Sequence, residues 1–174
     1  MEAAILEASN AVGRCATEEA LGRFDTDGSP IRVGETKLTV RGRHPKVYQS
    51  PYGEVQVERY VYQTSRGGRI YCPLEHQGRI IRGATPRFAS QLSHKYAQLN
   101  VRAVQTDLEQ NHGRKIATSY IQHVAEWVGD IAAAKGKGIN ELAAEIDEAR
   151  GVSSGLASAI RVYVLENVRV APKR

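Results

Sequence analysis

The strongest pattern of apolar and polar positions lies in residues 101–128. Apolar residues recur there at the spacing of one helix face, first at Val101, Val104 and Leu108 and then at Ile121, Val124 and Val128. The two stripes predict two amphipathic helices. Gly113 lies between them and can adopt the left-handed conformation that ends a helix, and Thr118 or Ser119 can cap the helix that follows.

Two helices joined by a glycine turn are typical of a helix-turn-helix, whose second helix reads the major groove of DNA. An ordinary helical hairpin gives the same pattern and is the alternative. In the first interpretation, Arg114 and Lys115 contact phosphates from the turn. The second helix then meets base edges or nearby phosphates with its outward side chains, which are Ser119, Tyr120, Gln122 and His123.

Four further arginines are candidate phosphate contacts, because they lie close to the predicted helix pair in the sequence. They are Arg79, Arg82, Arg87 and Arg102. For each of them a solvated surface charge is the alternative.

The first seventy residues predict one helix and a small sheet. Residues 2–24 form a helix that is expected to break near Gly13, residues 24–30 form a turn-rich linker, and short strands follow at 31–33 and 36–41. Residues 46–50 and 54–63 then flank the turn Ser50-Pro51-Tyr52-Gly53, and residues 69–72 return as a further strand. We therefore expect an antiparallel sheet over residues 31–72.

The strand at 54–63 alternates between an apolar and a polar face. The apolar face carries Val55, Val57 and Val61, and the polar face carries Glu54, Gln56, Glu58, Tyr60 and Tyr62. Arg59 falls on the apolar side, so either it is paired there or a bulge shifts the register.

From residue 85 onward the chain is expected to be helical. Thr85 and Pro86 are a strong start signal, and the first helix has an apolar stripe of Phe88, Leu92 and Leu99. After the helix pair, residues 136–138 form a break, followed by an acidic helix at 140–150 and a mixed tail at 157–170. The predicted fold class is α+β, with an N-terminal helix and linker, a β region, a helical region and a divergent tail at residues 1–30, 31–83, 84–135 and 136–174.

The charge distribution favours a nucleic-acid partner. The chain of 174 residues carries a net charge of +5, and residues 41–115 hold thirteen basic and five acidic side chains. Phosphate contacts would need this excess next to the helix pair. No apolar run is long enough for a membrane span, no secretory signal is visible, and the two cysteines do not make a disulfide framework, so we expect a cytoplasmic protein.

Candidate catalytic and metal-binding patterns are weak. Residues 151–155 match G-x-S-x-G, but no histidine follows them in the chain. Cys72 and His76 form only one close ligand pair. The acidic residues Glu141, Glu145 and Glu148 share one face of a predicted helix and are more typical of a solvated surface. We expect no metal, no cofactor and no catalytic activity.

Three further segments carry a resemblance to a known family. They are VYQSPYGEVQVERYVYQ, GGRIYCPLE and the stretch from IIRGATPRF to IQHVAEWVG. From His44 to about Lys135, the chain resembles the N-terminal half of an insertion-sequence transposase of the ISKra type. The resemblance implies a DDE-type transposase, in which the N-terminal part recognises terminal inverted repeats and a later domain uses Mg²⁺ to cut and join DNA. The chain departs from the family after about residue 135, so we expect a truncated product that keeps the DNA-binding part and lacks the catalytic domain.

Two hypotheses of different classes follow. The first is a DNA-binding fragment of a transposase that recognises insertion-sequence ends in double-stranded DNA. The second is an interaction module, in which the β hairpin and residues 161–170 pair with a second copy or with a full-length transposase.

Overall fold

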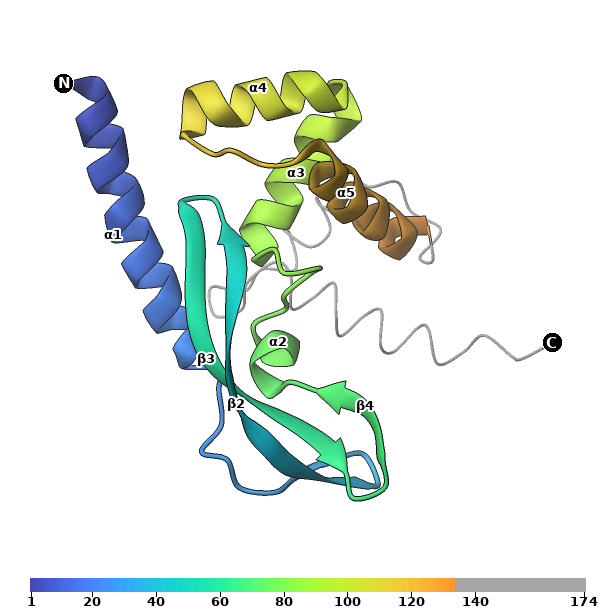
Figure 1. Ribbon diagram of the computed structural model, residues 1–174. Helices are drawn as coiled ribbons and strands as arrows, with labels where there is room; N and C mark the ends of the chain where they lie inside the picture. The colour runs from blue at the N-terminus through green and yellow to red at the C-terminus, as the bar shows by residue number, and fades with distance from the viewer. Residues whose placement is uncertain (134–174) are drawn as a thin grey trace, which may run out of the picture.

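The computed structural model describes residues 1–133 and has an α+β fold (Figure 1). The predicted break at 136–138, the acidic helix with its three glutamates, residues 151–155 and the tail lie outside the described residues. The elements run in the order α1 (Glu2–Gly22), β1 (Ile31–Val33), β2 (Thr36–Ser50), β3 (Gly53–Thr64), β4 (Gly67–Tyr71), α2 (Pro73–Gln77), α3 (Pro86–Gln98), α4 (Val101–His112) and α5 (Thr118–Ala133). The four strands form one antiparallel sheet in the order β1-β2-β3-β4, as predicted.

The two longest strands, β2 and β3, form a hairpin against which the helices are arranged. Figure 1 shows α1 beside it and α3, α4 and α5 gathered near its turn. The two strands predicted at 36–41 and 46–50 are one continuous strand, β2. Pro45 does not interrupt it, because β1 pairs only with residues 36–38 and the pairing of β2 at Pro45 is with Glu58 of β3. A proline is tolerated on such an edge.

The hairpin turn forms where the sequence predicted it. The Ser50 hydroxyl donates a hydrogen bond to the Gly53 carbonyl at 2.7 Å and accepts from the backbone N–H groups of Tyr52 and Gly53. Serine is favoured in turns because its hydroxyl can bond to the nearby backbone in this way.

A β-bulge lies in β2, opposite the last part of β3. The pairing shifts between Val40 and Gly42, which lie opposite Tyr62 and Val61. Tyr62 was predicted on the polar face of β3, but its side chain is fully buried, and its hydroxyl bonds with the hydroxyl of Thr26 in the linker after α1. The Tyr62 hydroxyl also donates a hydrogen bond to the Ser29 carbonyl at 3.1 Å, so the linker covers this side chain, and the alternation along β3 does not report that contact.

Arg59 is paired, which is the first of the two alternatives considered for it; the register shift lies beyond it, opposite Val61 and Tyr62. Its Nε lies 3.2 Å from Oε1 of Glu75 in α2. The same carboxylate oxygen accepts hydrogen bonds from Lys46 Nζ at 2.7 Å and from the Tyr48 hydroxyl at 3.0 Å. Glu75 thus connects α2 to both central strands.

Two apolar clusters make up the core. The first lies between the sheet, the end of α1 and α2, and contains Leu21, Tyr48, Val55, Val57, Cys72, Leu74 and Ile80. The second lies among the helices and contains the predicted stripe residues Phe88, Leu92, Val104, Leu108, Ile121, Val124 and Val128. Thr85 precedes α3 and Pro86 begins it, as predicted, but Leu99 lies after its last turn and is 45% exposed.

Helix α1 continues through Gly13, where a break was predicted. The glycine serves packing instead, because the ring of Tyr52 in the hairpin turn lies directly against it. A Cβ atom at position 13 would lie 2.3 Å from Tyr52 Cγ, whereas a Cβ at Gly22, the last residue of α1, would meet nothing within 4 Å.

We expect Gly13→Ala to lower the free energy of unfolding by about 1–2 kcal/mol, because overpacking against Tyr52 outweighs the gain in helix propensity. Gly22→Ala is the matched control and should be neutral or stabilising by up to about 1 kcal/mol. Chemical denaturation of both variants measures the difference. Equal effects of the two substitutions would show that the Gly13–Tyr52 contact does not position α1.

Candidate nucleic-acid interface

The predicted helix pair exists as α4 and α5. The Asn100 side chain caps α4 by accepting a hydrogen bond from Ala103 N at 3.0 Å, and Gly113 ends this helix with φ 63°, the predicted left-handed conformation. The predicted caps of the second helix are wrong. Thr118 is already helical, and the carbonyl that accepts the first hydrogen bonds of α5 belongs to Ala117, so the connecting segment is one residue shorter than expected.

The outward face of α5 carries most of the predicted contact residues. Ser119 and His123 are exposed, and Gln122 is half-buried. Glu126 and Asp130 are also exposed on this helix, further along the chain. Because carboxylates repel phosphates, only the N-terminal half of α5 suits an approach to DNA.

Tyr120 has a different position from its neighbours. It packs against the helical core, and its hydroxyl donates a hydrogen bond to the Arg82 carbonyl at 3.3 Å. Burial raises the pKa of Tyr120 to about 12, so the hydroxyl remains a donor at neutral pH. Tyr120 therefore holds the loop before α3 against α5.

Arg82 and Trp127 form an exposed pair beside Tyr120. The Arg82 guanidinium lies 4.0 Å from the centroid of the Trp127 ring, and both side chains are exposed. The backbone of Arg82 has φ 52°, an uncommon conformation for a residue other than glycine. Sequence reasoning missed Trp127, although it lies four residues after His123 and therefore on the same helix face.

Arg114 lies elsewhere than predicted. Its side chain is buried, it donates a hydrogen bond from Nη2 to Oε1 of Gln49 in β2 at 2.6 Å, and its guanidinium lies 5.4 Å from the centroid of the Phe88 ring. Burial lowers the pKa of Arg114. The predicted phosphate contact is corrected to a structural role, because this side chain joins the helices to the sheet and does not reach the surface.

The remaining candidates lie on the surface of the helical region. Lys115 follows Arg114 but points outward, with 85% of its side chain exposed and its Nζ 3.5 Å from Glu109 Oε1. Arg87 in α3 and Arg102 in α4 are exposed. Arg79 is half-buried before the loop, and burial lowers its pKa. Among the predicted contact residues, Arg82 and Tyr120 are joined by the hydrogen bond described above.

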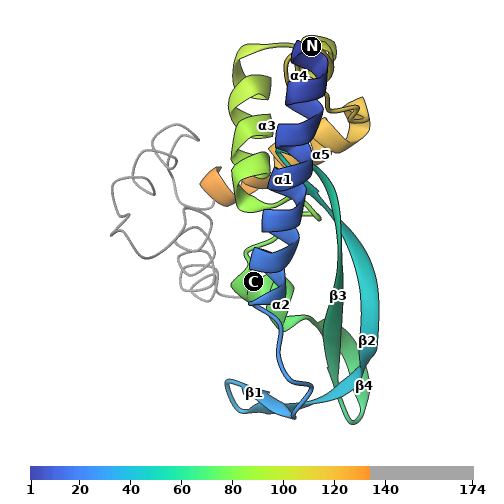
Figure 2. The ribbon, with the colours of Figure 1, turned by 90° about the vertical axis from the view of Figure 1, so that its left-hand side faces the viewer.

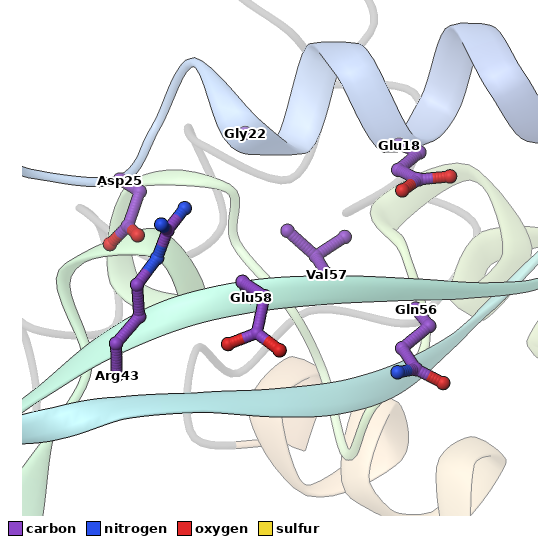
Figure 3. A pocket seen from close by; sticks show the side chains of 7 residues that line it. All are labelled: Glu18, Gly22, Asp25, Arg43, Gln56, Val57 and Glu58. Carbon is purple, nitrogen blue, oxygen red and sulfur yellow. The ribbon is translucent and has the colours of Figure 1, made fainter.

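A polar cleft of about 450 Å³ lies between the end of α1 and the sheet (Figure 3). It is lined by the carboxylates of Glu18, Asp25 and Glu58, and the Arg43 side chain extends toward Asp25. The Asp25 carboxylate accepts a hydrogen bond from the Tyr60 N–H at 3.2 Å. Because three of its four charged groups are acidic, this cleft does not suit a nucleic acid.

Among the described residues, no cluster of histidine, cysteine and acidic side chains could hold a metal ion. Cys72 is buried, and burial raises the pKa of its thiol. No helix of residues 1–133 is long and apolar enough to cross a membrane.

A known family matches the C-terminal part of the chain. Residues 126–168 match the model of the ribbon-helix-helix domain. The match begins inside α5, and residues 126–133 are its described part. A ribbon-helix-helix domain suggests DNA binding, and it is a different motif from the helix-turn-helix that the sequence predicted. Comparisons with curated proteins and with solved structures found no match.

Proposed function

We propose that this protein binds double-stranded DNA through a surface that includes the N-terminal half of α5. The ribbon-helix-helix match supports DNA binding by the chain, because that family suggests DNA binding. The match begins at residue 126 and so covers only the C-terminal half of α5, and the choice of the N-terminal half rests on its side chains. The exposed positions of Ser119 and His123 support it, since polar side chains on a rigid helix can reach base edges.

Exposed basic residues around the helices support the same proposal. Arg82, Arg87, Arg102 and Lys115 are exposed on or beside α3, α4 and the turn before α5. Within residues 1–133, Lys115 forms an ion pair at 3.5 Å, and the three arginines form none. Such side chains can release counterions from DNA when they bind phosphates.

We further propose that the DNA-binding surface derives from a transposase and recognises the terminal repeats of an insertion sequence, without catalytic activity of its own. The resemblance of residues 44–135 to the ISKra type supports this, through the hairpin, the CPLE segment in α2 and the helices that follow. Duplexes carrying the repeats that flank the gene should bind more tightly than shuffled duplexes of equal length. A Mg²⁺-dependent cleavage assay on the same duplexes tests the catalytic part, and a cleaved product would refute it.

The DNA-binding surface is tested by removing three exposed charges together. We expect Arg87→Ala, Arg102→Ala and Lys115→Ala in one variant to weaken binding to any duplex. The slope of log K against log salt should become less steep by about 0.9 for each phosphate that the variant no longer neutralises. Fluorescence anisotropy at several salt concentrations measures both quantities.

The matched control removes three exposed arginines that lie away from the helices, in β1, in the β3–β4 turn and in β4. The substitutions are Arg32→Ala, Arg66→Ala and Arg69→Ala. Both variants lose the same net charge, so a general electrostatic effect would be equal in the two. An equal loss of affinity in the two variants would show that Arg87, Arg102 and Lys115 are not part of the DNA interface. No binding by the unaltered protein at low salt would refute DNA binding itself.

A further inference from the structure

Helix α1 has two faces of different character. Its inner face packs on the hairpin and on the end of α4, through Gly13 against Tyr52 and a hydrogen bond from Asn10 Nδ2 to the His112 carbonyl at 3.2 Å. Figure 2 shows α1 in front of the sheet and α3, so its opposite face is turned away from them.

The outward face of α1 carries an apolar stripe. Its members are spaced alternately by four and three residues, and all of them are exposed: Met1, Ile5, Ala8, Val12 and Cys15. Val12 is 70% and Ile5 is 59% exposed. This spacing is the heptad pattern of helices that pair with another helix, and no charged residue interrupts it before Glu19.

We propose that this stripe is a self-association surface, which packs against the same stripe of a second copy of the chain in antiparallel orientation. The proposal goes beyond DNA binding and does not depend on it. A two-fold axis makes an isologous contact, so one patch that is complementary to itself is sufficient.

The orientation follows from the sizes of the stripe residues. An antiparallel pair centred between Ala8 and Val12 places Ala8 opposite Val12 and Ile5 opposite Cys15 of the second copy. Each layer then combines a large and a small side chain, which is the arrangement that fills space between two helices. A parallel pair would place Ala8 opposite Ala8 and leave a gap, with Val12 opposite Val12 in the next layer.

Charge complementarity supports the same orientation. Glu19 is the next residue of the stripe after Cys15, at the C-terminal end of the stripe. It forms an ion pair with Arg23. In the antiparallel pair, Glu19 lies beside the first turn of α1 in the second copy, where Met1 provides no side-chain cap. The helix dipole favours a carboxylate there, and Glu2 in the same turn lies about 100° around the helix from the stripe. A parallel pair would place Glu19 opposite Glu19.

The contact is small, which predicts how the association behaves. A standard protein interface buries about 800 Å² on each partner, and one helix pair buries less than that. We therefore expect a reversible equilibrium between monomer and dimer that depends on protein concentration.

The first test is sedimentation velocity of the full chain over a range of concentrations. The unaltered protein should shift from monomer to dimer, and Val12→Glu should raise the dissociation constant more than about tenfold, because it places an unpaired charge in the contact. Ile70→Glu is the matched control: it changes an exposed apolar residue of β4, and the dimer should persist. A monomer at all concentrations, or a dimer broken by Ile70→Glu alone, would overturn the proposal.

The second test determines the orientation with disulfides. Cys15 is exposed and Cys72 is buried. In the antiparallel pair the two Cys15 residues are about 15 Å apart along the axis, because each residue adds about 1.5 Å. A disulfide needs Cα atoms within about 7 Å. Mild oxidation should therefore not cross-link the unaltered protein, whereas Ile5→Cys should give a covalent dimer.

Combining Ile5→Cys with Cys15→Ala should abolish this cross-link, which shows that the two positions bond to each other. Efficient cross-linking of the unaltered protein would indicate a parallel pair and overturn the proposed orientation. A monomer whose Cys15 does not react with a soluble thiol reagent would show that the chain itself covers the stripe, and would overturn the proposal as a whole.

Discussion

Replacing Arg114 by alanine is expected to lower the free energy of unfolding by about 3 kcal/mol. The substitution removes a buried side chain that lies over Phe88 and leaves a cavity between α3 and the sheet. It also removes the donor that Gln49 Oε1 has at 2.6 Å. Both effects act at the junction between the helical region and β2, so we expect the whole described fold to be destabilised. Urea denaturation followed by circular dichroism measures this.

Two further variants separate the causes. Arg114→Met keeps most of the side-chain volume and removes only the hydrogen bond, so it should cost about 1 kcal/mol. Lys115→Ala changes the neighbouring exposed cation and should stay within about 0.5 kcal/mol of the unaltered protein. If Arg114→Ala were as stable as Lys115→Ala, the proposed structural role of Arg114 would be wrong.

Replacing Glu75 by alanine is expected to lower the free energy of unfolding by about 3 kcal/mol. The carboxylate contacts Lys46, Tyr48 and Arg59, and the Arg59 side chain is only 14% exposed. Without Glu75 this guanidinium is a charge with no counter-charge at its Nε, next to the apolar cluster under the sheet. Removing one partner of such a pair is more destabilising than replacing both.

The contribution of Glu75 should also depend on pH. Burial raises the pKa of Glu75, but the hydrogen bonds from Lys46 and Tyr48 and the nearby positive charges outweigh burial, so its pKa lies below the ordinary 4.5. The ionised group therefore stabilises the fold above pH 4.5, and this stabilisation is lost as the pH falls through the lowered value. We expect the difference in stability between the unaltered protein and Glu75→Gln to be constant near pH 7 and to shrink below pH 4.5. A difference that is independent of pH would show that ionised Glu75 is not the stabilising group.

For the predicted helix pair, the structure agrees with the sequence on the elements and differs from it on the side chains. The periodicity of residues 101–128 located both helices, and Gly113 ends the first of them. The same reasoning assigned Arg114 and Lys115 one shared role, although the structure buries the first and exposes the second. Adjacent residues in a connecting segment point in different directions, and no periodic pattern reports which of them meets the sheet.

Tertiary contacts also decided the position of Trp127 and the role of Gly13. Trp127 interrupts the apolar pattern of α5, and its partner is Arg82, which belongs to a loop far away in the sequence. Gly13 resembles a helix breaker, but Tyr52 packs on it from the hairpin. In both cases the partner comes from a different element, so a local interpretation of either residue has no access to it.

The sequence by itself determined the α+β class and the order of the longer elements, although it divided β2 into two strands and did not predict α2. Apolar periodicity and the glycine, proline and serine positions act within a few residues, where the local backbone decides the outcome. Only the tertiary structure decided which charged groups are free for a ligand, because Arg114 meets Gln49 across 65 positions of the chain and Arg59 meets Glu75 in another element. Burial depends on which segments pack together, and that depends on the whole fold.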